Sequence, residues 1–559
     1  MLILGVHSGW ADAGAAVFDD YALLAAVPLA RLTGMPRDGG RLPIEAIVEC
    51  LDIAQVRADE IGALSLSQGV FPGRYFGQLS LPRRLGRGLR QMFGRDTPMN
   101  LSDEMRRHGR AAAGLLDMPL LLDDLGLNRN IAVHVHRDHA AQALLALAEA
   151  EWDSGLVFTA GEQGCSAQVL KYGRLAALFD DEGESAAFNP GRLLDLCVDV
   201  LGLPDAATLF ALAAHGEPML GQAFLAHLRV DDAGRIDADF TAEGGMQRWL
   251  RRLVGEQPPA LVASSLVFAL ASLFSQAITA LMRRHELRHL ALGGSLFADP
   301  RLVHMIGQAL DLPGPPAALS LYPRASNAAL PLGGVLDLLL QRDGTAAWLQ
   351  KRQPLSRAAW GRDYGADIDP VLGNAGCRLV SHDPVRAAAA LLNAGKLVAC
   401  YDGRAYGADG GAARVVLFSG ANAGATAAAN QRLDRPGWLP PSVYVPEVGL
   451  GLLCPGLDAA QAQGGVAALP APRWQQTLHA ALLPDGLVVP VAVDARQQPL
   501  LADLLAAYAN LNEWPALLGL PMQAGSAPPA DAPAEALQLL QDGRVDYIVT
   551  DNAVWERGI

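Results

Sequence analysis

Cysteine is scarce in this chain, and none of its six cysteines lies in a C-x-x-C pair. Isolated cysteines of this kind are typical of buried or free thiols in a reducing compartment. Positive charge is scarce as well, because 44 Lys and Arg stand against 58 Asp and Glu and give a net charge of −14. We therefore expect no general nucleic-acid-binding surface and no surface for anionic membranes.

Long apolar runs are also missing. No stretch of about twenty uninterrupted apolar residues predicts a membrane span. The first six residues are apolar but lack a basic segment, so they are not interpreted as a signal peptide. Hydrophobic residues make up 51% of the chain and charged residues 18%, as in globular proteins. We expect a cytoplasmic protein, and a length of 559 residues predicts more than one domain.

Familiar nucleotide and nucleophile motifs are absent too. There is no Walker-type lysine motif, and no G-x-G-x-x-G opens a predicted helix. The pairs Gly293-Gly294 and Gly410-Gly411 are weak phosphate-loop signals and are more typical of tight turns. Cys165 has no identifiable histidine or acid partner, so we interpret it as a structural thiol.

The segment 131–143, IAVHVHRDHAAQA, contains His134, His136 and His139. An alanine-rich run that predicts a helix follows, and then an apolar strand ends in a glycine turn at 155–164. His136 and His139 are three positions apart, so on a helix they would share one face. Two imidazoles and a carboxylate from the turn would suit iron, manganese or zinc.

The turn that should supply this carboxylate has Ala160, which carries no ligand atom. Glu162 follows two residues later, and its side chain is expected on the other side of the turn. The alternative interpretation gives the histidines a surface or helix-capping role. Both interpretations stay open at this point.

Short apolar runs separated by glycine turns predict an α/β fold with an internal repeat. Three strands are predicted over 2–30, and the same plan recurs over 155–179, which indicates two similar lobes. Helices are predicted over 43–54, 101–116, 192–201, 206–214, 244–254, 260–285 and 332–341, and strands over 289–295 and 319–323. Residues 343–366 are predicted to be an irregular linker. A second unit follows, with helices over 384–394, 500–511 and 534–541 and strands over 397–401, 451–454, 486–493, 515–520 and 546–550.

Several phrases occur in one order over almost the whole chain. They are Arg31-Leu-Thr33, His139-Ala-Ala141, Leu290-Ala-Leu-Gly-Gly294, Tyr401-Asp-Gly-Arg404 with Arg414, Trp514-Pro-Ala-Leu-Leu518 and Asp546-Tyr-Ile-Val549. Together they resemble the O-carbamoyltransferases of the nodulation-protein and antibiotic-tailoring type. The resemblance implies an α/β chain in three parts: an actin-like, sugar-kinase-like double-lobed domain over 1–345, a linker over 346–366 and a YrdC-like α/β domain over 367–559.

In that family, carbamoyl phosphate and ATP give carbamoyl-adenylate in the C-terminal domain. The carbamoyl group then passes to an acceptor hydroxyl at a metal site in the N-terminal domain. The resemblance implies catalytic roles for Asp12 and His139, metal binding by His136 and His139, and nucleotide or carbamoyl phosphate binding by Arg404 and Arg414.

Many polar positions depart from the family pattern. The expected hairpin histidine is Ala11, the first metal histidine is Val135, and the two acidic metal ligands are replaced by Ala160 and Asn327. Polyanions are bound through arginine and lysine, and positions expected to carry such cations are occupied here by Pro36, Thr208, Asp409, Asp434 and Val489. Aspartate repels the phosphates that a cation would attract.

We therefore hypothesise a carbamoyltransferase-family protein that has lost the parent reaction and the metal site. It would act as a pseudoenzyme partner or scaffold in a biosynthetic pathway, beside an intact carbamoyltransferase or another pathway enzyme, and as a dimer. One alternative is an active O-carbamoyltransferase with a reduced site that still uses ATP and iron or manganese. The other is a different acyl-transfer or condensation reaction in the inherited cleft.

Overall fold

The computed structural model of the chain describes residues 1–77, 97–162, 164–182, 188–312, 318–321, 327–355, 359–402, 404–406, 414–463, 465–512 and 516–558. The chain folds into two units. Unit 1 comprises residues 1–150 and 325–362, and unit 2 comprises residues 151–324 and 363–559. Within unit 2 we call residues 151–324 the second lobe and residues 363–559 the C-terminal part.

Unit 1 is built around a five-stranded sheet with the order β3-β2-β1-β4-β7. The first three strands form an antiparallel meander, and β4 and β7 extend the sheet parallel to β1. These strands are β1 (Leu2–His7), β2 (Gly14–Asp19), β3 (Ala22–Pro28), β4 (Ala63–Ser67) and β7 (Ala132–His136). Three short strands lie outside it: β5 (Val70–Pro72), β6 (Pro98–Asn100) and β15 (Ala359–Trp360).

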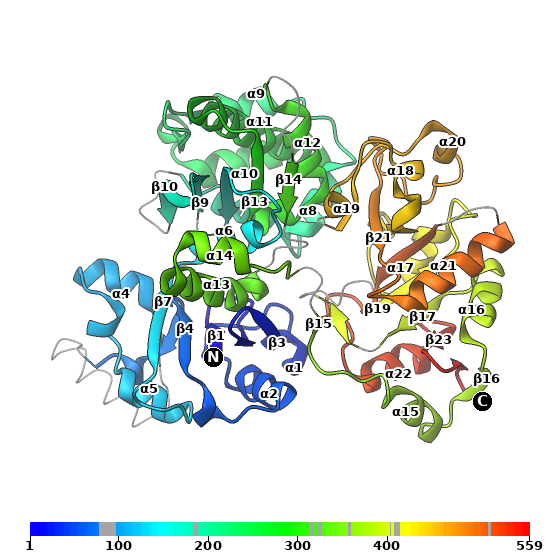
Figure 1. Ribbon diagram of the computed structural model, residues 1–559. Helices are drawn as coiled ribbons and strands as arrows, with labels where there is room; N and C mark the ends of the chain where they lie inside the picture. The colour runs from blue at the N-terminus through cyan, green and yellow to red at the C-terminus, as the bar shows by residue number, and fades with distance from the viewer. Residues whose placement is uncertain are drawn as a thin grey trace. The chain divides into compact units, whose positions relative to one another are not determined.

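Helices cover this sheet, and α13 lies against β1, β4 and α6 (Figure 1). The α-helices of unit 1 are α1 (Leu29–Thr33), α2 (Ile44–Ala54), α4 (Leu101–His108), α5 (Met118–Asp124), α6 (Asp138–Ala148), α13 (Leu330–Asp343) and α14 (Thr345–Lys351). Its short 3-10 turns are η1 (Ala58–Glu60), η2 (Gly73–Tyr75), η3 (Ala112–Gly114) and η6 (Asn327–Ala329). The close approach of α13 requires Gly5, because a Cβ there would lie 2.3 Å from the Pro331 carbonyl oxygen.

The second lobe repeats the plan of unit 1. Its five-stranded sheet has the order β10-β9-β8-β13-β14, with an antiparallel meander followed by two parallel strands. The strands are β8 (Gly155–Gly161), β9 (Gly164–Lys171), β10 (Arg174–Glu182), β13 (His289–Gly293) and β14 (Ala318–Leu321), and a separate pair is β11 (Leu228–Val230) and β12 (Ile236–Ala238). The predicted internal repeat is therefore confirmed, since both sheets have the same strand order.

The helices of the second lobe are α7 (Pro190–Leu201), α8 (Ala206–Ala213), α9 (Gly221–Leu225), α10 (Met246–Glu256), α11 (Pro259–His285) and α12 (Pro300–Ala309), with the 3-10 turns η4 (Thr241–Glu243) and η5 (Ser295–Ala298). Helix α11 is long and apolar enough to cross a membrane by length and composition alone. However, 78% of its most apolar window is buried inside the protein. Its apolar side chains belong to the core of the second lobe, which is the pattern of a core helix.

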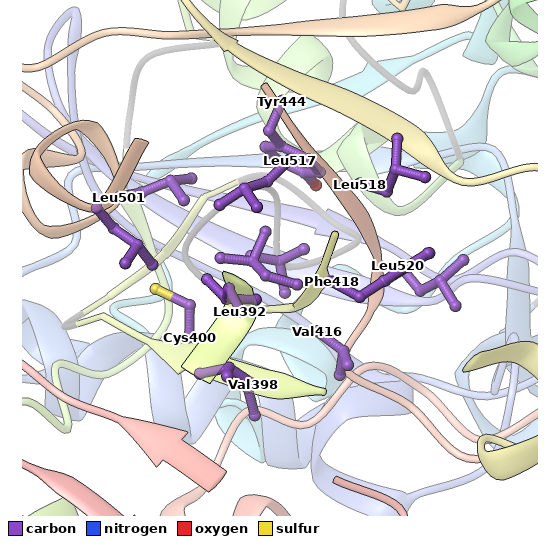
Figure 2. Packing of buried hydrophobic residues seen from close by; sticks show 14 of the residues in the cluster. Leu392, Val398, Cys400, Val416, Phe418, Tyr444, Leu501, Leu517, Leu518 and Leu520 are labelled. Atoms are coloured by element: carbon purple, nitrogen blue, oxygen red, sulfur yellow. The ribbon is translucent and has the colours of Figure 1, made fainter. Parts of the chain in front are cut away.

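The C-terminal part contains a mixed eight-stranded sheet with the order β16-β24-β23-β17-β19-β22-β20-β21. The strands are β16 (Arg378–Ser381), β17 (Val398–Tyr401), β19 (Arg414–Phe418), β20 (Ser442–Pro446), β21 (Val489–Val493), β22 (Leu517–Pro521), β23 (Tyr547–Val549) and β24 (Val554–Glu556), and β18 (Ala405–Tyr406) lies outside this sheet. Figure 2 shows side chains from its central strands and from α16 and α21 in one apolar core, among them Cys400, Val416 and Leu517.

The α-helices of the C-terminal part are α15 (Ile368–Asn374), α16 (Pro384–Asn393), α17 (Ala425–Arg432), α18 (Leu450–Leu453), α19 (Ala459–Gln463), α20 (Pro472–Gln475), α21 (Pro499–Asn512) and α22 (Pro533–Gln541), with the 3-10 turn η8 (Glu447–Gly449). The strand predicted over 451–454 is wrong, because these residues belong to α18 and the loop after it. A short apolar run does not by itself distinguish a strand from a helical turn.

The sequence predicted an irregular linker over 343–366, but part of this segment is helical. It contains α14, whose Trp348 is fully buried. The sequence TAAWLQK has good helix formers around that tryptophan, so burial of one large side chain is enough to hold this turn of helix in place.

Candidate functional site

The parallel strands of unit 1 end in polar residues at one edge of the sheet. His7 closes β1, Ser67 closes β4 and His136 closes β7. All three side chains are buried. Because the carboxyl edge of parallel strands is where α/β proteins place their functional groups, this edge is the candidate site. We call it the strand-end cluster, which comprises His7, Ser8, Ser65, Ser67, His136 and Asp138.

Two hydrogen bonds of the Ser65 hydroxyl fix the tautomer of His136. Ser65 Oγ lies 2.9 Å from His136 Nδ1 and donates its proton to the Gly334 carbonyl at 2.7 Å. Nδ1 must therefore carry the hydrogen of the imidazole, and Nε2 is left with its lone pair. Burial lowers the pKa of His136 to about 3, so the ring is neutral. Within the described residues, Nε2 makes no hydrogen bond.

Helix α13 is packed directly on this ring. A Cβ at Gly334 would lie 2.1 Å from His136 Cε1, so only glycine fits there. A second histidine of the same strand also contacts α13, because His134 Nε2 lies 2.7 Å from Asp337 Oδ2. His134 and His136 thus both bind the helix that covers the sheet, which is a structural use of the histidine-rich segment.

The predicted metal pair does not share a helix face. His136 ends β7, whereas His139 lies in the first turn of α6, and His139 is also buried. The prediction from their spacing was wrong on this point, because the run of alternating Val and His favours a strand up to position 136. The described residues contain no group of three His, Cys, Asp or Glu side chains placed to hold a metal ion. They therefore do not fit an ion held by two histidines and two carboxylates.

Asp12, a predicted catalytic residue, lies in the loop between β1 and β2. Its backbone has a φ of 57°, and its carboxylate lies 3.2 Å from Arg37 Nε. His7 was not predicted from the sequence, and its Nδ1 lies 3.9 Å from Asp138 Oδ1. A polar residue at the end of an apolar strand was the available signal for His7.

In the second lobe, the turn between β8 and β9 corresponds to the loop between β1 and β2 of unit 1, and neutral groups lie beside it. Ala160 is fully buried in β8, and Thr159 and Ser166 share a hydroxyl hydrogen bond of 2.7 Å across the hairpin. The carbonyl of Glu162 accepts a hydrogen bond from the Asn189 side chain, which caps α7. Asn327, at the second expected carboxylate position, lies in the 3-10 turn η6 of unit 1.

In the C-terminal part, Arg414 is fully buried at the start of β19. Its guanidinium carbon lies 3.6 Å from the centroid of the Tyr401 ring, and Nη1 donates to the Asp402 carbonyl. Burial, followed by the nearby charge of Asp551, raises the pKa of Asp402 to about 6. Arg404 is half-buried in the loop between β17 and β18.

Positions where the resemblance implied cations have other local roles. Thr208 lies in the first turn of α8, where its amide donates to Asp205. Asp434 is exposed and forms an ion pair with Arg544 at 2.6 Å. Val489 opens strand β21. Asp409 lies outside the described residues.

The two sheets of identical order, each with a meander followed by two parallel strands, give the chain two similar α/β lobes. No family model matches the chain, and no curated protein matches it.

Solved structures do match it. A ROK hexokinase from Thermus thermophilus is 17% identical, with a TM-score of 0.33, and covers 62% of this chain and 100% of its own. Component A of (R)-2-hydroxyglutaryl-CoA dehydratase from Acidaminococcus fermentans is 14% identical, with a TM-score of 0.33, and covers 60% of this chain and 96% of its own. A ROK family glucokinase from Streptomyces griseus, in complex with glucose and AMPPNP, is 15% identical, with a TM-score of 0.29, and covers 61% of this chain and 100% of its own.

Proposed function

We propose that this protein is a carbamoyltransferase-related pseudoenzyme with an actin-like domain and a YrdC-like C-terminal domain. It has lost the reaction of ATP with carbamoyl phosphate and serves as a partner or scaffold in a biosynthetic pathway. The environment of Arg414 carries the proposal. This arginine belongs to the signature that binds the polyanionic substrates in the family that the sequence resembles.

Arg414 is fully buried, stacked on Tyr401 and bonded to the Asp402 carbonyl. A guanidinium binds phosphate through a planar fork of free N–H groups. A fork that stacks on an aromatic ring inside the core stabilises the fold instead. We therefore assign Arg414 a structural role.

The charges near Arg414 also disfavour a polyanion. Burial and then the charge of Asp551 raise the pKa of Asp402, and burial and then the charge of Asp363 raise the pKa of Asp551. A phosphate brought to this place would add further negative charge, and each like-charge contact at about 4 Å costs roughly 1 to 4 kcal/mol near a protein surface. A nucleotide or carbamoyl phosphate site would need the opposite sign of charge here.

Unit 1 supports the proposal independently. The histidine-rich segment that would bind the metal contributes His134 and His136 to the packing of α13. Two side chains that hold a helix in this way explain why the segment keeps its histidines without the acidic ligands. The dimer and the intact partner enzyme remain part of the proposal.

A second candidate is an active O-carbamoyltransferase with a reduced site. The bare Nε2 of His136 favours it, because a histidine that donates through Nδ1 to a neighbour is arranged as metal ligands are. In this form His136 and His139 would hold iron or manganese, and Arg404 and Arg414 would contact ATP. His139→Ala with unchanged turnover would exclude this candidate.

The deciding experiment is pyrophosphate release by the purified full chain with ATP and carbamoyl phosphate, with and without Fe²⁺ or Mn²⁺. We expect no release above the rate without protein. An intact carbamoyltransferase in the same assay is the positive control. Clear turnover by this chain would overturn the pseudoenzyme proposal and favour the reduced-site enzyme.

The partner role needs a separate test. The tagged full chain, recovered from its native host, is expected to bring down an intact carbamoyltransferase or another enzyme of the same pathway. Recovery of the chain alone, at expression levels where it is folded, counts against the partner role.

A further inference from the structure

The second lobe and the C-terminal part share a contact surface inside unit 2. Arg301, in the first turn of α12, forms an ion pair with Asp485 in which Nε and Oδ2 lie 2.5 Å apart. Only 12% of the Arg301 side chain and 30% of the Asp485 side chain are exposed. An ion pair this well enclosed has a fixed geometry and is little screened by solvent.

A backbone hydrogen bond lies beside the ion pair. The Ala467 amide donates to the Pro300 carbonyl at 3.2 Å, and His304 bonds to the backbone of Ala467. Both partners on the lobe side belong to α12, whose first turn is capped by Asp299 through the Leu302 amide. A capped helix start therefore presents the carbonyl, the guanidinium and the imidazole together.

Apolar contacts surround these polar groups. Ala214, just after α8, shares a buried cluster with Ala467, Leu483 and Leu487. Val466 of the C-terminal part belongs to the core of the second lobe. These shared clusters exclude water around the ion pair, which strengthens it.

The C-terminal side of this surface is held in shape by its own bonds. The turn that carries Asp485 is closed by the Leu483 amide, which donates to the Leu487 carbonyl at 2.8 Å. Ala468 and Val488 exchange two backbone hydrogen bonds, 3.0 and 2.9 Å long. Asp485 and Ala467 are thus positioned before they meet α12, so the surface costs little entropy to form.

We infer that Arg301, Pro300, Ala214, Asp485 and Ala467 form a dock that joins the C-terminal part to the second lobe as one moving body. The sequence had placed a linker, over 346–366, before an independent C-terminal domain. In this inference the C-terminal part follows α12 whenever the second lobe moves. The inference does not depend on the proposed function.

The test is amide hydrogen exchange in the full chain, read at Ala467. Arg301→Met keeps the length of the side chain and removes its charge, and we expect the Ala467 amide to exchange at least tenfold faster. Asp485→Asn is expected to accelerate exchange of the Ala467 amide as well, but by a smaller factor. The double variant should exchange no faster than Arg301→Met alone, because both changes remove one interaction.

Two readouts separate the dock from a local effect. The Val488 amide, which bonds to Ala468 within the C-terminal part, should keep its wild-type exchange rate. Arg229→Met is the matched control, because Arg229 forms an exposed pair with Asp237 in the same lobe. The inference would be overturned if the Ala467 amide exchanged at its wild-type rate in both folded variants, Arg301→Met and Asp485→Asn. It would also be overturned if the Val488 amide were accelerated as much as the Ala467 amide.

Discussion

The two five-stranded sheets have the same strand order but different carboxyl edges. In unit 1 the parallel strands end in the buried residues His7, Ser67 and His136. In the second lobe β8 and β13 end in Gly161 and Gly293. Strand order depends on the apolar interior of each strand, so the residues at the strand ends are free to diverge. The same plan therefore has a polar, histidine-containing edge in one sheet and glycine at two of the strand ends in the other.

The largest expected effect tests how tightly the polar edge is packed. Gly334→Ala places a Cβ 2.1 Å from the His136 ring. We expect the free energy of unfolding to fall by about 3 kcal/mol, since overpacking of a core outweighs the gain in helix propensity of about 1 kcal/mol. Urea unfolding followed by circular dichroism measures the change.

The control for this variant is Gly255→Ala in α10 of the second lobe, where a Cβ meets nothing within 4 Å. It should raise the free energy of unfolding by about 0.5 to 1 kcal/mol. Equal stabilisation by both substitutions would show that His136 does not require a glycine above it.

The next effect compares one serine from each sheet. Ser65→Ala leaves the His136 Nδ1–H and the Gly334 carbonyl without their partner, and we expect a loss of about 2 to 3 kcal/mol in stability. Ser166→Ala breaks only the hydroxyl pair with Thr159 and should cost about 1 kcal/mol. Chemical denaturation of both variants checks the order, and a larger loss for Ser166→Ala would contradict the comparison.

A smaller, pH-dependent effect belongs to the second lobe. Burial raises the pKa of Asp299 to about 6 from its ordinary value of 3.8. The folded protein therefore binds this proton more tightly than the unfolded chain, and the resulting stability is lost as the pH rises through 6. Asp299→Asn keeps an acceptor for the Leu302 amide and removes the charge.

We therefore expect Asp299→Asn to be more stable than the wild type at pH 7.5, by about 1 kcal/mol, and equal to it near pH 4. Thermal unfolding across this pH range measures the difference. A variant that is less stable at pH 7.5 would show that the ionised carboxylate is needed at the start of α12.

The smallest effect concerns the loop before the polar edge. Asp12 has a φ of 57°, which glycine adopts without strain, and its pair with Arg37 involves a guanidinium that is half exposed. Asp12→Gly should change stability by less than about 0.5 kcal/mol, because relief of the strain at positive φ offsets the lost pair and the larger entropy of the unfolded chain. A loss of several kcal/mol in urea unfolding would indicate that Asp12 has a larger structural role.

Much of the fold could be predicted from the periodicity of apolar residues. The meanders of both lobes, the long helix α11 and the last helix α22 lie where the pattern placed them. Short segments were less predictable. The turn of helix at Leu450–Leu453 and the helix around Trp348 were not predicted from apolar periodicity, and burial of Trp348 helps to hold the second of them in place.

The candidate site could be predicted only in part. The three histidines marked the right segment, but their partners come from β4 and from α13, far away in the sequence. Spacing along the chain does not reveal such partners, so the relay through Ser65 and the contact with Asp337 were not foreseen. Arg414 was predicted to bind nucleotide or carbamoyl phosphate, and the sequence did not reveal that it stacks on Tyr401.

Residue order alone was sufficient for the α/β class and the repeated meander, because both follow from local alternation of apolar and turn residues. It was also sufficient to show that position 160 is an alanine, which carries no ligand atom. Packing alone decided that His134 and His136 hold α13 and that the C-terminal part docks on α12. These contacts join residues distant in sequence, and their energies come from burial and geometry that exist only once the chain has folded.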